Sequence, residues 1–187
     1  MKKAFFLDRD GVINEEVSYL HEPDKTVLLP KVSEAVELIH SLGFLAIAVT
    51  NQSGVARGYY PEADVHSVHL RLQSILLKHS ASAVIDSWYC CCHHPEISGE
   101  CSCRKPHPGM LLQAAKDFDI DLSKSFMIGD RMSDLNAGKN AGCLNSCLVL
   151  SGYGKNELSK ACEAGFPTAE NLLEAVKLLA ENGKIYE

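Results

Sequence analysis

Residues 4–14, AFFLDRDGVIN, join a short apolar run to two acidic side chains and a glycine. Four consecutive apolar residues that end abruptly predict a strand buried on both faces of a parallel sheet. Asp8 and Asp10 follow at once, so two acidic side chains stand at the carboxyl end of this strand. Gly11 then allows the chain to turn away, because glycine adopts backbone conformations that other residues avoid.

Downstream of this stretch, apolar runs alternate with segments of helical periodicity. Further strands are predicted at residues 44–49, 84–89, 125–128 and 146–150, and helices at about residues 32–42, 61–80, 108–118, 133–141 and 169–182. Residues 14–30, 93–107 and 152–167 are expected to be irregular. The alternation predicts an α/β fold, a three-layer sandwich around a mostly parallel sheet.

Length and composition fit one domain spanning residues 1–187, with 46% hydrophobic and 22% charged residues. The segments at residues 14–30 and 90–104 are too short to form a separate cap domain.

A net charge of −6 disfavours a nucleic acid partner. Because the chain has no apolar run of about eighteen residues and no signal-peptide core, we expect a cytoplasmic protein without a membrane partner. We also expect a monomer, although the apolar stripe of the predicted tail helix leaves a subunit contact open.

Polar side chains gather at the predicted strand ends. Asp8 and Asp10 follow the first strand, Thr50 follows the second, and Asp130 follows a later one. The ligand crevice of an open α/β sheet lies at these ends, and carboxylate oxygens are the donors that Mg²⁺ prefers. Lys105 and the Thr50 hydroxyl are suited to bind phosphoryl oxygens. An isolated Asp-x-Asp is usually a turn or a cap, but the ordered set favours phosphate chemistry.

These motifs resemble those of known phosphatases. The resemblance to haloacid dehalogenase-type phosphatases rests on residues 8–14, 49–54, 104–106 and 129–130. A narrower similarity to D-glycero-D-manno-heptose 1,7-bisphosphate 7-phosphatases rests on residues 51–58, 91–95 and 101–109. The related histidinol-phosphate phosphatases are expected to have Asn-Gln-Asp-Gly where this chain has Asn-Gln-Ser-Gly.

The resemblance implies a role for each catalytic side chain. Asp8 would attack phosphorus and form an aspartyl-phosphate, while Asp10 would protonate the leaving oxygen and then activate water. Thr50 and Lys105 would stabilise the phosphoryl group. Magnesium would lie between Asp8, the main-chain carbonyl of Asp10, and Asp130.

The resemblance also implies a sugar phosphate substrate. Arg104 is placed in the catalytic set and would recognise the sugar end, while Arg131 stands where the family is expected to have a lysine. The implied substrate-binding residues are Asp8, Asp10, Glu16, Tyr19, Thr50, Asn51, Gln52, Ser53, Arg57, Arg104, Lys105 and Arg131. The implied activity removes the 7-phosphate of a heptose bisphosphate on the route to nucleotide-activated heptose, for the lipopolysaccharide core or a related glycan.

A cluster of cysteines and histidines occupies the loop at about residues 90–104. Five of the eight cysteines lie there, and in a chain without an export signal this favours metal binding over disulfides. Cys91-x-His93 and Cys101-x-Cys103 offer one nitrogen and three sulfurs, the composition of a closed tetrahedral Zn²⁺ site. The alternative is a set of buried free thiols.

The register of the first zinc pair stays open on spacing alone. Cys90-x-Cys92 and Cys92-x-His94 have the same parity as Cys91-x-His93, and only the family resemblance selects Cys91 and His93. With four protein ligands the ion would be structural, and it would hold the loop that delivers the cationic residues to the phosphate.

Three other functions compete with the implied one. A histidinol-phosphate phosphatase would share the fold and the mechanism. A zinc-stabilised binding module would keep the fold without chemistry, and the intact acidic and basic motif residues argue against it. A polynucleotide phosphatase is disfavoured by the acidic charge.

Overall fold

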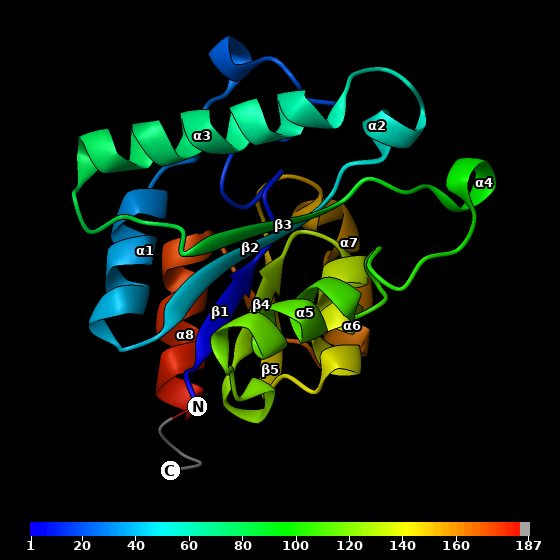
Figure 1. Ribbon diagram of the computed structural model, residues 1–187. Coiled ribbons are helices and arrows are strands. Elements are labelled where there is room, and N and C mark those ends of the chain that lie inside the picture. Colours follow the sequence, from blue (N-terminus) through cyan, green and yellow to red (C-terminus); the bar gives the residue numbers. More distant parts are fainter. Residues whose placement is uncertain (184–187) are drawn as a thin grey trace.

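The computed structural model describes residues 1–183, and within them one sheet of six parallel strands has the order β3-β2-β1-β4-β5-β6 (Figure 1). The strands are β1 (Ala4–Leu7), β2 (Leu45–Asn51), β3 (Ser87–Cys91), β4 (Phe126–Gly129), β5 (Asn145–Val149) and β6 (Thr168–Ala169). Neighbouring strands are parallel throughout, which confirms the predicted α/β class.

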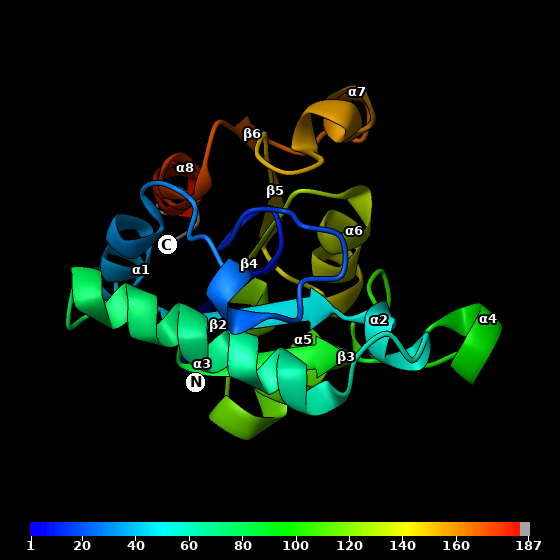
Figure 2. The same cartoon turned by 90° about the horizontal axis from the view of Figure 1, so that it is seen from above.

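Helices cover both faces of the sheet (Figure 2). They are α1 (Val32–Ser41), α2 (Ser53–Ala56), α3 (Glu62–His79), α4 (Pro95–Ser98), α5 (Gly109–Phe118), α6 (Met132–Ala141), α7 (Gly154–Glu163) and α8 (Leu172–Gly183), with 3-10 turns at Pro23–Lys25 and Leu122–Lys124. Phe5 and Leu7 of β1 join the core formed with α1, α3 and α8. Ala4 and Phe6 join the core formed with α5 and α6, as expected for side chains that alternate along a strand.

The two halves of the sheet meet between β1 and β4. From β1 the chain continues to β2 and β3 on one side, and β4, β5 and β6 follow on the other side. The Asp8 N–H donates a 2.9 Å hydrogen bond to the Ile128 carbonyl, so the carboxyl ends of β1 and β4 lie side by side. Such a switch point is where open α/β sheets bind ligands, and it brings Asp8 close to Asp130.

Three sequence-based assignments are wrong in detail. Residues 152–167, expected to be irregular, contain α7 and lead into β6; few residues of α7 are apolar, and it buries only Gly154 and Ala161. The third strand begins at Ser87 rather than residue 84, because the Ile85 N–H donates to Gln73 Oε1 on α3 instead of joining the sheet. The loop at residues 93–107 contains the short helix α4.

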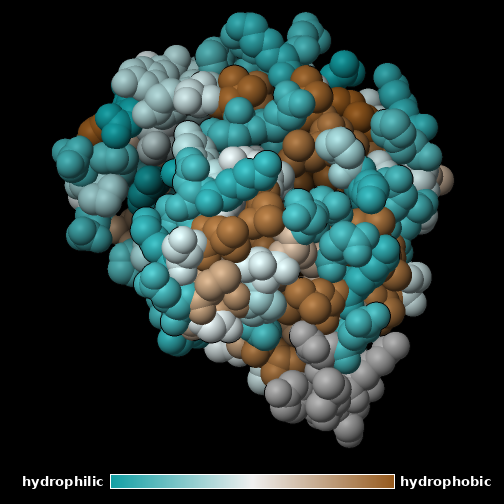
Figure 3. Space-filling view, turned by 180° about the vertical axis from the view of Figure 1, so that it is seen from behind, coloured by the Kyte–Doolittle hydropathy of each residue, from teal (hydrophilic) through white to brown (hydrophobic). Residues whose placement is uncertain are grey.

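The surface is of mixed character. Figure 3 shows apolar and polar residues interspersed over one face of the molecule. Exposed large apolar residues such as Leu70, Leu77 and Leu112 are spread over α3 and α5. Among residues 1–183, no helix combines the length and the apolar character needed to cross a membrane.

Candidate active site

A pocket of about 430 Å³ opens at the carboxyl ends of the central strands. All twelve residues predicted to bind substrate line it, so the fold gathers positions that are far apart in the sequence. The pocket is also lined by Val17, Ser18, Leu20, Tyr60, His94, Ser133, Asp134 and Tyr153. The binding roles of these residues stay predictions.

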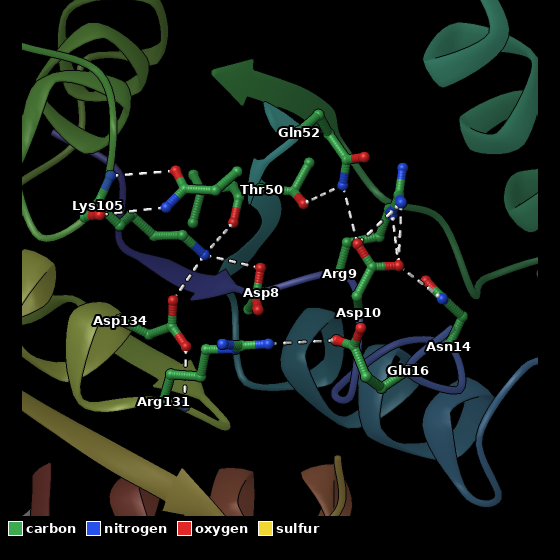
Figure 4. A network of polar contacts seen from close by, with 12 residues as sticks. Asp8, Arg9, Asp10, Asn14, Glu16, Thr50, Gln52, Lys105, Arg131 and Asp134 are labelled. Carbon is green, nitrogen blue, oxygen red and sulfur yellow. Dashed lines mark hydrogen bonds and ion pairs between the residues drawn. The ribbon is translucent and has the colours of Figure 1, made fainter. Parts of the chain in front are cut away.

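Lys105 lies between two buried carboxylates at the floor of the pocket (Figure 4). Its Nζ is 2.7 Å from Asp8 Oδ1 and 2.7 Å from Asp134 Oδ1, and it donates a 2.8 Å hydrogen bond to the Val49 carbonyl. Burial alone would lower the pKa of Lys105, but Asp134 and Asp8 outweigh it and raise that pKa above its usual value. The ammonium group therefore stays charged.

Burial has a different effect on Asp8. It raises the pKa of the Asp8 carboxyl well above the usual value, although Lys105 opposes this shift. The nearby Asp134 and Asp130 raise the pKa of Asp8 further. Because a carboxylate must be ionised to act as a nucleophile, the site calls for additional positive charge.

The acidic side chains here fit a hard divalent cation. Carboxylate oxygens of Asp8, Asp130 and Asp134 lie within 4.8 Å of one another. Asp130 Oδ2 accepts a 2.8 Å hydrogen bond from the Tyr153 N–H, but its buried Oδ1 has no hydrogen-bond partner among the described residues. Burial and then Asp134 raise the pKa of Asp130 to about 7. The unpaired buried oxygen of Asp130, beside the Asp8 carboxylate, fits the one or two carboxylate ligands that usually bind Mg²⁺.

Two glycines make room for the Asp130 carboxylate. Gly11 and Gly152 have φ angles of +84° and +52°, and a Cβ atom on either would collide with Asp130 Oδ2. Both positions therefore need glycine for conformation and for close approach. The glycine that follows the Asp-x-Asp segment thus shapes the acidic site.

The Asp10 carboxylate is held by three side chains, two of which the sequence did not single out. Arg9, with no exposed surface, donates to Asp10 through Nε and Nη2 at 2.8–3.1 Å. Asn14 Nδ2 and Gln52 Nε2 donate to it at 2.9 Å and 2.8 Å. Gln52 Nε2 also donates to Thr50 Oγ1 at 2.8 Å. These contacts fix the orientation of Asp10 and connect it to Thr50.

Asp134 is a further residue that the prediction missed. It follows Asp130 by four residues in the first turn of α6, and its Oδ2 accepts a hydrogen bond from the Arg131 N–H at 3.0 Å. The sequence offered one indication of this role, because Asp134 lies only four residues after Asp130 of the recognised motif. The predicted contribution of the Asp10 main-chain carbonyl to magnesium binding stays a prediction.

Lys105 is also fixed through its backbone. The Asn51 amide donates to the Lys105 carbonyl and accepts from the Lys105 N–H, both at 3.1 Å. This reciprocal pair joins the loop after β3 to the end of β2. The preceding residue, Arg104, donates to the His93 carbonyl at 3.2 Å, so the same loop connects the pocket to the cysteine cluster.

Four predicted zinc donors converge in this loop. Cys103 Sγ is 2.9 Å from Cys91 Sγ, 3.5 Å from Cys101 Sγ and 3.3 Å from His93 Nδ1. Cys91 Sγ is 3.7 Å from both Cys101 Sγ and His93 Nδ1. Tetrahedral donors about 2.3 Å from one zinc ion are roughly 3.8 Å apart, so the four groups enclose a space of the right size.

The rim of the pocket carries several cations. Arg131 lies over the Tyr153 ring, 3.7 Å from its centroid, and 4.0 Å from Glu16. Nη2 of Arg57 is 2.9 Å from Nε2 of His94. With Arg104, these residues surround an acidic floor with positive charge, an arrangement suited to a substrate that carries phosphate.

The chain is similar to known phosphatases. A HAD-hydrolase-like family model matches residues 102–175. A protein of Thermosynechococcus vestitus, named D-glycero-D-manno-heptose-1,7-bisphosphate 7-phosphatase, is 42% identical, and the match covers 94% of each chain. The chain belongs to the heptose-1,7-bisphosphate 7-phosphatase family. This membership confirms the family resemblance predicted from the motifs.

Two further members of the heptose-1,7-bisphosphate 7-phosphatase family support this placement. The D-glycero-beta-D-manno-heptose-1,7-bisphosphate 7-phosphatase of Pasteurella multocida is 44% identical over 81% of this chain and 84% of its own length. The crystal structure of the D,D-heptose 1,7-bisphosphate phosphatase from B. bronchiseptica, complexed with magnesium and phosphate, is 32% identical, with a TM-score of 0.86. That match covers 96% of this chain and 99% of the other, so the whole fold is shared.

Proposed function

We propose that this protein removes the 7-phosphate of D-glycero-D-manno-heptose 1,7-bisphosphate. The observation that carries the proposal is the buried Asp8, Lys105 and Asp134 group at the floor of a pocket lined by cations. Membership of the heptose phosphatase family supplies the substrate class.

In the first half-reaction, Asp8 attacks the phosphorus atom. An Asp8 carboxylate oxygen forms the new bond to phosphorus while the bond from phosphorus to the sugar oxygen breaks. Lys105 and Thr50 stabilise the charge on the phosphoryl oxygens. Asp10 gives its proton to the leaving sugar oxygen, and the product is an aspartyl-phosphate on Asp8.

In the second half-reaction, Asp10 takes a proton from water. The water oxygen bonds to phosphorus, the bond from phosphorus to Asp8 breaks, and inorganic phosphate leaves. Arg9, Asn14 and Gln52 hold the Asp10 carboxylate throughout. Asp10 therefore works from a fixed position beside the reacting phosphoryl group.

Asp8 and Asp130 are the side chains that would hold magnesium, together with the main-chain carbonyl of Asp10, whereas both oxygens of Asp134 are taken by Lys105 and the Arg131 N–H. When bound, the cation neutralises the mutual repulsion of the carboxylates and the phosphate. The unpaired Asp130 Oδ1 supports this assignment, and the B. bronchiseptica relative was crystallised with magnesium.

The cationic rim would bind the rest of the substrate. Arg57 and Arg104 line the same pocket as Lys105, so a substrate with one phosphate beside Lys105 can present a second anionic group to these guanidinium groups. A second phosphate at the far end of the sugar would pair with these guanidinium groups. A bisphosphate is therefore a better match to the pocket than a monophosphate.

Cys91, His93, Cys101 and Cys103 would bind a structural zinc ion. Cys101→Ser is expected to lower the zinc content by one equivalent and to lower Tm by roughly 5–10 °C, a loss of about 2–3 kcal/mol at this chain length. Metal analysis and calorimetry would check this, with Cys162→Ser as an exposed control. Zinc content and melting equal to wild type would contradict the ligand assignment.

A substrate comparison tests the proposed function. Phosphate release by the magnesium-supplemented protein should be faster on heptose 1,7-bisphosphate, supplied as each anomer, than on heptose 7-phosphate or histidinol phosphate. A higher kcat/KM for histidinol phosphate would instead establish the related activity. Absence of turnover on all of these esters would favour the non-catalytic binding module.

A further inference from the structure

Cys90 and Cys92 do not join the proposed zinc ligands. Side chains alternate along an extended segment, so these two thiols face away from Cys91 and His93. Their Sγ atoms are 3.9 Å apart, close to the 3.7 Å that separates Cys91 from Cys101 in the zinc cluster. Cys91 with His93 and Cys90 with Cys92 thus belong to two separate groups of donors at one strand end.

A carboxylate completes the second group. Glu62, the first residue of α3, places an oxygen so that it and the two sulfur atoms all lie within 4.8 Å of one another. Cys90 and Cys92 are half-buried, whereas Glu62 is exposed. Two sulfurs and one oxygen form a compact donor set that is accessible from solvent.

We propose that Glu62, Cys90 and Cys92 form a second metal site, for a thiophilic divalent cation of the zinc class. Both thiols lose their protons on binding, and the two sulfurs and the carboxylate oxygen coordinate the ion. Three protein ligands leave one tetrahedral position for water or an external ligand. The site therefore differs from the closed zinc cluster in its open coordination and its access to solvent.

An ion here would join two elements beside the substrate pocket. The thiols lie at the end of β3, and Glu62 begins α3 directly after the segment that carries Arg57 and Tyr60. Figure 1 shows α2 and the first turn of α3 at the same end of the molecule. A metal ion bound at this site would restrain the segment that carries Arg57 and Tyr60, on the side of the strand end opposite to the zinc cluster.

Metal titration of the reduced, metal-free full-length chain tests the proposal. Co²⁺ is added without oxygen, and bound metal is followed by thiolate-to-cobalt charge-transfer absorption and by metal analysis. We expect the wild type to bind one equivalent more than Cys90→Ser/Cys92→Ser. Cys162→Ser, which removes an exposed thiol elsewhere, should bind as much as wild type. Equal stoichiometry for the wild type and the double variant would overturn the site.

Glu62→Gln provides a second measurement that does not depend on the double variant folding. Even residues that only contact the ligands of a metal site contribute about 10–100-fold to metal affinity. Loss of the Glu62 carboxylate should therefore lower the affinity for the additional Co²⁺ ion by about tenfold or more. The cobalt spectrum of the zinc cluster should stay unchanged. An unaltered affinity for the extra equivalent would remove Glu62 from the site and overturn the proposed donor set.

Discussion

Asp8→Asn is expected to lower kcat by about four orders of magnitude or more, because the amide cannot attack phosphorus. The fold should survive the change. Lys105 keeps its 2.7 Å contact with Asp134 and its hydrogen bond to the Val49 carbonyl. Burial also disfavours the charged form of Asp8, so replacing this carboxylate with a neutral amide should leave Tm unchanged or slightly higher. Phosphate release and thermal melting would measure the two effects.

Asp24→Asn is the matched control for this variant, since it makes the same chemical change on an exposed side chain outside the pocket. It should keep wild-type turnover. Residual activity of Asp8→Asn within about a hundredfold of wild type would exclude Asp8 as the nucleophile, because removal of a nucleophile costs far more.

Lys105→Met is expected to impair both catalysis and folding. Without the ammonium group, Asp8 and Asp134 face each other as buried carboxylates with no cation between them. Removing one partner of a buried ion pair costs about 3–5 kcal/mol of unfolding free energy. Loss of the cation at the phosphoryl group should lower kcat by about a hundredfold to a thousandfold. Urea unfolding without magnesium and steady-state kinetics with magnesium would measure each loss.

The double variant Lys105→Met/Asp134→Asn separates these two effects. It removes the repulsion between the carboxylates, so part of the lost stability should return while kcat stays low. Lys116→Met is the control, because Lys116 is exposed on α5. If Lys105→Met were as stable as the wild type, Lys105 would not be compensating the buried charges of Asp8 and Asp134.

The fold was predictable from its strands. Buried parallel strands are short apolar runs, and residues 4–7 are the clearest example. By contrast, α7 was missed because it packs at the edge of the sheet with little buried apolar surface. The start of β3 was wrong because a side chain on α3, Gln73, takes the Ile85 N–H, and no local pattern reveals such a bond.

The candidate site was predictable where polar residues follow strands. Asp8, Thr50 and Asp130 stand at strand ends, and the parallel sheet brings those ends together. The role of Arg9 was not predictable, because its guanidinium turns back onto the neighbouring Asp10 and is buried by distant segments. The pair Cys91 and His93 came from the family resemblance and not from spacing, because spacing alone does not show which side chains face Cys101. That the chain acts as one domain without a cap stays a prediction.

The reciprocal amide pair between Asn51 and Lys105 divides the loop after β3 into two parts. The backbone of Lys105 is bonded to Asn51 at the end of β2, whereas the side chain of Arg104 before it donates to the His93 carbonyl beside the cysteine cluster. If Arg104 binds the sugar end as proposed, we expect substitutions in that earlier part to change substrate preference without displacing the ammonium group of Lys105. Substrate preference and phosphate-transfer chemistry are therefore expected to be separable by mutation.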